Sequence, residues 1–316
     1  MCGIAGYMGR KEINKPMMES TLRLMKNRGP DFCNYISSKN SDLYTVLLHS
    51  RLSIIDLEAR SNQPFTIGNY TLVFNGEIYN YIELRGHLEE KGVRFQTSSD
   101  TEVLLQYYLI YGDAGIKDFE GMWSFAIYDQ EKNSLILSRD RFAEKPLYYL
   151  KTPDGIYFGS EVKFIRCLAG IKLKPNISHL FRYMVNGYKS LYKQEDTFFE
   201  EIHEVPFATN LYINKDLSIK NRRYWMPAYS PREMSLKEAV QGFRDLLLNS
   251  IKIRLRADVP LAFCLSGGVD SAAIVSIAAK VFKYEVATFS IIDCDERYNE
   301  LENVEAMLGD LKCENT

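Results

Sequence analysis

The sequence has few of the patterns that mark membrane, secreted or metal-bound proteins. No apolar run approaches the roughly 18 residues that a membrane-spanning helix needs, and the longest, residues 259–265, is typical of a buried strand. The N-terminus lacks the basic and apolar regions of a secretory signal peptide. The six cysteines and four histidines are dispersed, without a CxxC pair. Neither a zinc site nor a disulfide framework is therefore indicated, and we expect a reduced, cytoplasmic protein without a structural metal.

An excess of charge of one sign is also missing. The chain has 39 Lys and Arg against 41 Asp and Glu, a net charge of −2. This balance gives no electrostatic reason to expect nucleic acid or an anionic membrane as a partner. The chain does have apolar content, 46% of 316 residues, which is enough for a sizeable core. For this length two domains are the better expectation.

In the first two thirds of the chain, short strand-like runs alternate with turn signals, and helices are inserted between them. Strands are expected over residues 3–8, 44–49, 70–74, 123–129, 134–138, 146–150 and 155–159. Helices are expected over 16–27, 79–92, 101–111 and 161–169. We predict that the strand over 70–74 stops at Asn75-Gly76, a dipeptide typical of turns. A sheet-on-sheet core flanked by helices is the simplest architecture for these elements.

The pattern changes near residues 229–231. Residues 235–258 have apolar side chains spaced by three and four, which predicts a long amphipathic helix. A strand over 259–265, a loop over 266–271, a helix over 272–282 and a strand over 285–292 then predict a βαβ unit with a parallel sheet. We therefore predict three segments: a first domain, 1–215; a linker, 216–234; and a second domain, 235–316.

The N-terminus offers a candidate nucleophile. Cys2 directly follows the initiator methionine, and a residue as small as cysteine lets Met1 be trimmed. The new N-terminus would carry a thiol and an α-amine, which titrate near pH ~8.5 and ~8. The amine can then act as the base for the thiol without a histidine. Taken alone the pattern is weak, because Cys2 could equally be a small residue that happens to follow Met1.

The predicted βαβ unit contains a glycine-rich loop between its first strand and its helix. The loop reads Ser266-Gly267-Gly268-Val269-Asp270-Ser271. Two glycines let the backbone approach an anion, and the helix start adds unpaired N–H groups. The loop lacks the Gly-Lys-[Ser/Thr] of P-loop NTPases, and it resembles that of the PP-loop ATP pyrophosphatases. The resemblance implies ATP and Mg²⁺ as cofactors, with pyrophosphate on the loop, Asp270 near the metal, and Leu265 and Ile291 flanking the adenine.

Polar clusters lie at the predicted strand ends of the first part, and each alone is a plausible turn or helix cap. They are Arg28-Gly29-Pro30-Asp31, His49-Ser50-Arg51-Leu52-Ser53, Asn75-Gly76-Glu77-Ile78-Tyr79-Asn80 and Ser99-Asp100-Thr101-Glu102. Together with Cys2, they resemble in order and type the class II, N-terminal nucleophile, glutamine amidotransferase domain. The likeness runs to about residue 213. It implies an α+β αββα sandwich, followed by part of an α/β parallel-sheet PP-loop domain.

This resemblance assigns roles that fit the chemistry of glutamine hydrolysis. The Cys2 thiol attacks the side-chain amide and gives a γ-glutamyl thioester and ammonia. The developing oxyanion needs fixed donors, the substrate carboxylate needs an arginine, and its ammonium needs a carboxylate. The implied residues are the Asn75 side chain and Gly76 N–H for the oxyanion, Arg51 in two-pronged contact with the carboxylate, Asp100 for the ammonium, and Glu77 in the same pocket. We expect His49 to be a core residue rather than a catalyst.

The two parts in this order resemble glutamine-hydrolysing asparagine synthetase, whose ammonia amidates ATP-activated aspartate. The expected partners are glutamine, ATP and a carboxylate acceptor, and a homodimer is one assembly that we consider. Two alternatives stay open: another acceptor such as a sugar acid of surface polysaccharides, and a stand-alone glutaminase that docks a separate synthetase. Asn34 and Ala143 stand where that family usually has glycine. The family also continues well past residue 316, so we expect a fragment or a truncated product.

Overall fold

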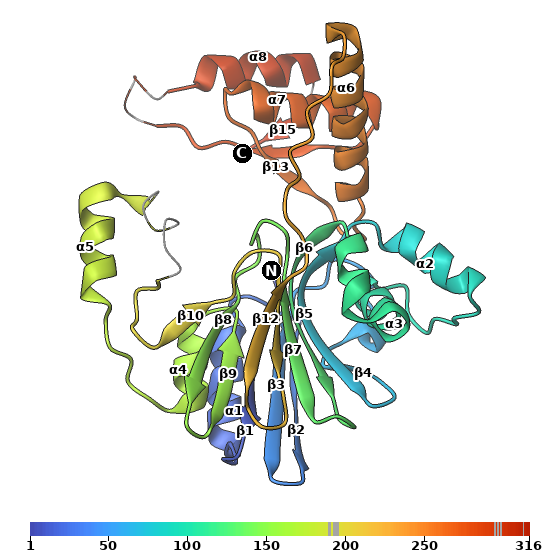
Figure 1. The fold of residues 1–316 in the computed structure, drawn as a ribbon. Coiled ribbons are helices and arrows are strands. Elements are labelled where there is room, and N and C mark those ends of the chain that lie inside the picture. The colour runs from blue at the N-terminus through green and yellow to red at the C-terminus, as the bar shows by residue number, and fades with distance from the viewer. Residues whose placement is uncertain (189–190, 192–195, 294, 296, 298, 312) are drawn as a thin grey trace. The chain divides into compact units, whose positions relative to one another are not determined.

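The chain forms two compact units in the computed structural model, Met1–Ala228 and Tyr229–Thr316. The structure describes all residues except 189–190, 192–195, 294, 296, 298 and 312 (Figure 1). Cys294 thus lies outside the described residues, and the other five cysteines are free thiols. Within the described part of the chain, none of the helices combines the length and the apolar character that a membrane crossing requires.

The first unit is built on two six-stranded antiparallel sheets. The first sheet contains β1 (Gly3–Gly9), β2 (Phe32–Asn40), β3 (Leu43–Arg51), β8 (Tyr148–Thr152), β9 (Gly155–Gly159) and β10 (Ile202–Glu204) in the order β10-β8-β9-β1-β3-β2. The second contains β4 (Phe65–Ile67), β5 (Tyr70–Ile78), β6 (Gly121–Asp129), β7 (Ser134–Arg139), β11 (Thr209–Ile213) and β12 (Ile219–Arg223) in the order β12-β11-β7-β6-β5-β4. β1 therefore lies inside the first sheet and β5 near one edge of the second.

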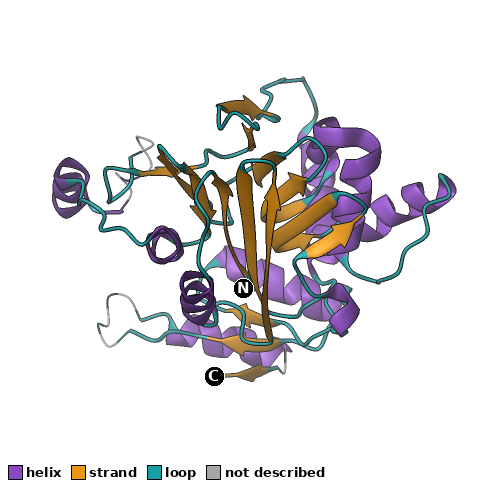
Figure 2. Cartoon of the chain, turned by 90° about the horizontal axis from the view of Figure 1, so that it is seen from below, coloured by secondary structure: helices purple, strands orange, loops and turns teal. Residues whose placement is uncertain are grey.

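Helices cover the outer face of each sheet, so the unit has four layers. The helical elements are α1 (Lys15–Met25), η1 (Ala59–Ser61), α2 (Tyr81–Glu90), α3 (Asp100–Tyr111), η2 (Gly112–Asp118), α4 (Val162–Ala169) and α5 (Ile177–Asn186). One apolar cluster joins the two sheets, a second joins α2 and α3 to the second sheet, and a third joins α1 and α4 to the first. Figure 2 shows strands at the centre of this unit and helices outside them. The predicted αββα sandwich is confirmed.

Local sequence explains where several helices begin. Asn14 caps α1 by accepting from the Met17 N–H, with proline in the first turn. Ser99, in one of the polar clusters that are plausible helix caps, accepts from the Glu102 N–H and starts α3. Because Ser99 ends the preceding loop, Asp100 becomes the first residue of the helix and is held in place there.

The structure corrects the sequence prediction at Asn75-Gly76. β5 does not turn there but continues to Ile78, paired with β6 as Asn75↔Ser124 and Gly76↔Trp123. A Cβ atom on Gly76 would lie 2.1 Å from the Met122 carbonyl oxygen. The glycine is therefore needed because two backbones approach closely, and no turn is involved.

Other elements were not predicted at all. β2, β10, β11 and β12 have weak or mixed apolar periodicity, and β10 and β11 pair with strands that are distant in the sequence, β8 and β7. α5 was also not predicted, although its apolar side chains follow a helical spacing. β12 lies inside the segment 216–234 that we predicted as a linker, and it pairs with β11. Tertiary pairing rather than local sequence therefore decides β10 and β11.

Two residues that depart from the family pattern have different consequences. Asn34 lies in β2 opposite His49, in a regular antiparallel register. Ala143 has a φ of 55°, in the left-handed region where a side chain is strained. Its carbonyl still accepts a hydrogen bond from Arg139 Nη2 at 3.1 Å. A glycine would thus relieve strain at residue 143, whereas the regular strand geometry at residue 34 requires no glycine.

The second unit contains a three-stranded parallel sheet, as the βαβ pattern predicts. Its elements are α6 (Leu236–Arg254), β13 (Ala262–Cys264), α7 (Val269–Ser276), the π-helical η4 (Ile277–Val281), β14 (Ala287–Phe289), α8 (Leu301–Leu311) and β15 (Glu314–Asn315). Ser235 and Glu238 form a capping box at the start of α6. The predicted helix after the glycine loop begins at Val269 rather than residue 272, so Gly268 is its N-cap.

Candidate active site

Backbone groups hold the Cys2 thiol at the start of β1. β1 runs antiparallel to β3 with Gly3 opposite Ser50, which brings Cys2 beside the residue that follows Arg51. The Leu52 N–H points at Cys2 Sγ at 3.3 Å, and the Leu52 carbonyl oxygen is 3.5 Å from the same sulfur. The thiol therefore has one defined location, as a nucleophile requires.

Burial, with the help of neighbouring carboxylates, favours the protonated form of the Cys2 thiol while Met1 is present. Burial raises the pKa of Cys2 to about 11, and the negative charges of Glu77 and Asp100 act in the same direction. Burial also lowers the pKa of the Met1 α-amine, as do the cations of Arg28 and Lys145. An amine here is thus biased toward its neutral, basic form.

The predicted oxyanion donors lie in β5 of the second sheet, which contacts β1 and β3. Asn75 is fully buried, and its Nδ2 lies 3.4 Å from the hydroxyl of Ser124. Its Oδ1 and one carboxylate oxygen of Glu77 are buried without a hydrogen-bond partner among the described residues. Buried polar groups are normally paired, so these two atoms are available to a polar ligand.

Asp100 and Glu77 form an acidic pair beside the thiol. Asp100 is 4% exposed and accepts a hydrogen bond from the Ile78 N–H at 2.9 Å. Burial raises its pKa to about 6 in spite of that bond and of the nearby Arg51. Burial, followed by the charge of Asp100, also raises the pKa of Glu77. Two neighbouring carboxylates repel each other when both are ionised, so the pair favours the binding of a cation.

Arg51 lies close to this pair, but its guanidinium is turned toward its own loop. Nη1 donates to the Glu58 carbonyl at 3.0 Å and to Asn62 Oδ1 at 2.8 Å. Nη2 donates to the carbonyls of Ile55 and Asp56. A two-pronged contact with a substrate carboxylate would have to replace some of these bonds. The predicted role of Arg51 stays a prediction.

Two cations of the site were missed by reasoning from the sequence. Arg28 donates through Nε to the Cys2 carbonyl at 2.8 Å and through Nη1 to Glu161 at 3.1 Å. Lys145 is 4% exposed, and its Nζ lies 3.2 Å from Met1 Sδ. Arg28 belongs to a polar cluster visible in the sequence, but only the fold brings it and Lys145 to the N-terminus.

His49 is buried as expected and is unsuited to proton transfer. It has no exposed surface, and its Nε2 lies 3.0 Å from the Phe74 carbonyl oxygen. Burial lowers its pKa to about 3, so it stays neutral at physiological pH. It links β3, which ends at Arg51, to the residue before Asn75.

In the second unit, the glycine-rich loop has the geometry of an anion-binding turn. The N–H of Gly267 donates to a carboxylate oxygen of Glu300 at 2.9 Å, so this loop already holds one anionic group. The hydroxyls of Ser266 and Ser271 are 2.9 Å apart. Val269 and Asp270 are exposed in the first turn of α7. The donor set thus fits a phosphate group.

The two residues predicted to flank adenine differ in exposure. Leu265 is buried, in the apolar cluster of this unit, and its N–H donates to the Phe289 carbonyl. The side chain of Ile291 is fully exposed, beyond the end of β14. No group of three or more potential metal-ligating side chains is found in the described ranges, and the predicted role of Asp270 near Mg²⁺ stays a prediction.

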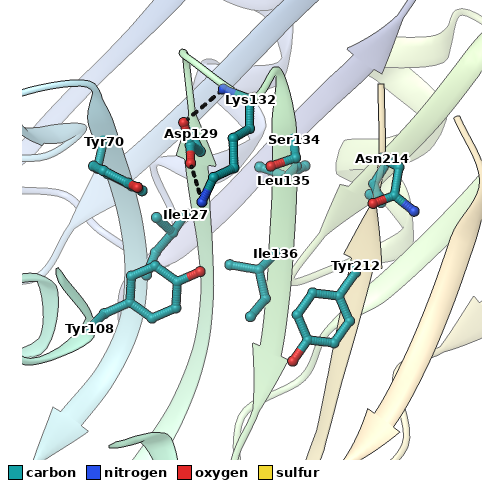
Figure 3. Close-up of a pocket in the computed structure, with 11 residues that line it drawn as sticks. Tyr70, Tyr108, Ile127, Asp129, Lys132, Ser134, Leu135, Ile136, Tyr212 and Asn214 are labelled. Atoms are coloured by element: carbon teal, nitrogen blue, oxygen red, sulfur yellow. Dashed lines mark hydrogen bonds and ion pairs between the residues drawn. The ribbon is translucent and has the colours of Figure 1, made fainter. Parts of the chain in front are cut away.

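A separate hollow of about 220 Å³ lies on the outer face of the second sheet (Figure 3). Tyr70, Tyr108 and Tyr212 surround it, above an apolar floor that includes Ile127 and Ile136. Lys132 pairs with Asp129 at 3.5 Å on its rim. None of the predicted site residues lines this hollow, so it is distinct from the site around Cys2.

Comparison with known proteins matches the two parts of the chain to two different families. Residues 1–225 match the family described as glutamine amidotransferase domain, and residues 242–316 match asparagine synthase. The chain is 32% identical to asparagine synthetase [glutamine-hydrolyzing] 1 of Bacillus subtilis, over 100% of this chain and 49% of that protein. It is 31% identical to the amidase chyE of Penicillium rubens, over 90% of this chain and 43% of that protein. The chain thus spans about half the length of these relatives.

Solved structures agree with the fold. A glutamine phosphoribosylpyrophosphate amidotransferase from B. subtilis has a TM-score of 0.53 at 17% identity, covering 88% of this chain and 64% of that chain. An allosteric regulatory enzyme of purine biosynthesis has a TM-score of 0.55 at 15% identity, covering 100% and 80%. The chain therefore belongs to the glutamine amidotransferase family, with a class II amidotransferase domain followed by a segment of an asparagine synthase domain.

Proposed function

We propose that the first unit hydrolyses glutamine at Cys2 and supplies ammonia for ATP-dependent amidation of a carboxylate, with aspartate as acceptor and asparagine as product. The observation that carries the proposal is the location of the Cys2 thiol. It lies against Leu52, with Asp100 and Glu77 close enough to influence its pKa. A nucleophile, a cation-binding carboxylate pair and amide donors on β5 are the groups that glutamine hydrolysis needs.

The chemistry follows from these groups once Met1 is removed. The Cys2 α-amine takes the thiol proton, and sulfur attacks the side-chain amide carbon of glutamine. The carbonyl electron pair moves to oxygen, where the Asn75 amide and the Gly76 N–H stabilise it. The C–N bond then breaks, the amine returns the proton, and ammonia leaves. Water hydrolyses the thioester to glutamate and restores the thiol.

The second unit would activate the acceptor. We propose that ATP binds with its phosphates on residues 266–271, where the Gly267 N–H already donates to a carboxylate and the hydroxyls of Ser266 and Ser271 lie 2.9 Å apart. Asp270 would hold the Mg²⁺, which supplies charge neutralisation to the phosphates when bound. Leu265 and Ile291 would contact the adenine. The products of activation would be pyrophosphate and an acyl adenylate, whose attack by ammonia releases AMP.

The acceptor is tested by measuring AMP release from the full-length natural protein with glutamine and ATP. Aspartate is expected to stimulate AMP and asparagine formation together. Stimulation by a sugar acid and not by aspartate would support the alternative acceptor, and the amidase among the relatives makes that comparison necessary. Glutamine hydrolysis without any acceptor-dependent AMP would support a stand-alone glutaminase instead.

The KM for glutamine is expected to rise as the pH falls through about 6. Below this pH the Asp100 carboxyl, whose pKa is raised to about 6, is protonated and offers no charge to the substrate ammonium. Asp100→Asn should raise KM by at least about tenfold and remove its pH dependence near 6. Steady-state kinetics across about pH 5 to 8 measure both effects.

The matched control for that substitution is Asp118→Asn. Asp118 lies outside the site and accepts a hydrogen bond from the Tyr107 hydroxyl. The side-chain oxygen of an asparagine can accept the same bond. The KM of Asp118→Asn for glutamine should show the same dependence on pH as the wild type. A wild-type KM that stays flat across the same pH range would contradict the role of Asp100.

A further inference from the structure

In its present orientation the Asn75 carboxamide leaves two groups without a hydrogen-bond partner: its own Oδ1 and the O–H of Ser124. Its Nδ2 faces Ser124 Oγ at 3.4 Å, while its Oδ1 is buried and unpartnered. Among the described residues the Ser124 hydroxyl has no acceptor for its own hydrogen, because the carboxamide presents an N–H₂ group to it. Both side chains are fully buried, so bulk solvent does not reach them.

Turning the carboxamide by 180° about the Cβ–Cγ bond pairs these groups. The Oδ1 atom then faces Ser124 and accepts its O–H, and Nδ2 moves to where Oδ1 was. The 3.4 Å separation is long for a hydroxyl–carbonyl bond, which favours about 2.8 Å, so a small approach accompanies the turn. One N–H₂ group is then left unpaired, and it is the kind of donor that an oxyanion needs.

We propose that Ser124 is a positioning residue that selects the catalytic orientation of the Asn75 amide. This inference rests on the proposed glutamine hydrolysis and names a residue that acts through Asn75. The strand register fits it: Ser124 of β6 is directly opposite Asn75 of β5, so their side chains share one face of the sheet. A hydroxyl can present its hydrogen to Oδ1, whereas an alanine leaves both amide orientations equally accessible.

A double-mutant cycle with glutamine hydrolysis as the readout tests this proposal. Ser124→Ala should lower kcat about tenfold, a fraction of what an oxyanion donor contributes, and should leave KM for glutamine within about twofold. In the Asn75→Ala background, the same Ser124→Ala change should alter kcat less than about twofold, because the amide through which Ser124 acts is gone.

Ser138→Ala provides a matched control on the same sheet. Ser138 is also fully buried, and its hydroxyl accepts from Trp123 Nε1 at 3.2 Å, away from Asn75. Its kcat should stay within about twofold of wild type. An unchanged kcat in Ser124→Ala, or a tenfold loss that persists without the Asn75 amide, would overturn the proposal. A wild-type chain that does not hydrolyse glutamine would instead reject the proposed function itself.

Discussion

Cys2→Ala is expected to abolish glutamine hydrolysis while glutamine still binds. The sulfur is the only group that forms the thioester in the proposed reaction, so no residual covalent route remains. The loss of kcat should reach at least about 10⁴-fold, as for other enzymes that lose a nucleophile. Alanine is also small enough for Met1 to be removed, so the α-amine is retained in the variant. Ammonia release and calorimetric binding of glutamine measure the two properties separately.

Cys33, in the same unit, provides the control for the loss of a thiol that is not the nucleophile. Cys33 lies in β2, partly buried, and its Sγ is 3.6 Å from the Gly29 carbonyl oxygen. Burial raises its pKa, as it does for Cys2. Cys33→Ala should hydrolyse glutamine at close to the wild-type rate. Hydrolysis that survives Cys2→Ala would assign the nucleophile to another residue and remove the mechanism proposed for this site.

The parts of this protein that were predictable from sequence depend on short-range signals. Apolar side chains spaced by three and four predict α6, and the glycine loop between a strand and a helix predicts the parallel sheet of the second unit. The order of polar clusters identifies the family and its αββα fold. The helix and loop signals each lie within a few residues, so tertiary contacts do not disturb them, and the order of the clusters is itself a property of the sequence.

The parts that sequence could not provide are long-range contacts and their electrostatic effects. Arg28 and Lys145 are separated from Cys2 by many residues, and only the packing of the fold brings them to the N-terminus. The Asn75-Gly76 dipeptide has the composition of a turn, yet its pairing with β6 keeps it extended. The raised pKa of Asp100 likewise depends on burial that no local pattern reports.

Removal of Met1 is expected to activate the site by about a thousandfold. With Met1 present, the nitrogen of Cys2 is an amide and cannot accept a proton, and the thiol has a pKa of about 11. Because this pKa is raised, the reactive thiolate is lost as the pH falls below 11. At pH 8 only about 10⁻³ of the thiol is ionised, and this fraction grows about tenfold per pH unit. In the processed chain, the α-amine of Cys2 supplies the base that Met1 blocks.

The measurement uses one protein before and after cleavage of an N-terminal leader that ends just before Cys2. The uncleaved chain should show at most about 10⁻³ of the kcat of the cleaved chain at pH 8, with a rate that still rises toward higher pH. Intact mass confirms that the cleaved chain begins with Cys2. Equal rates before and after cleavage would show that the free amine is not the base.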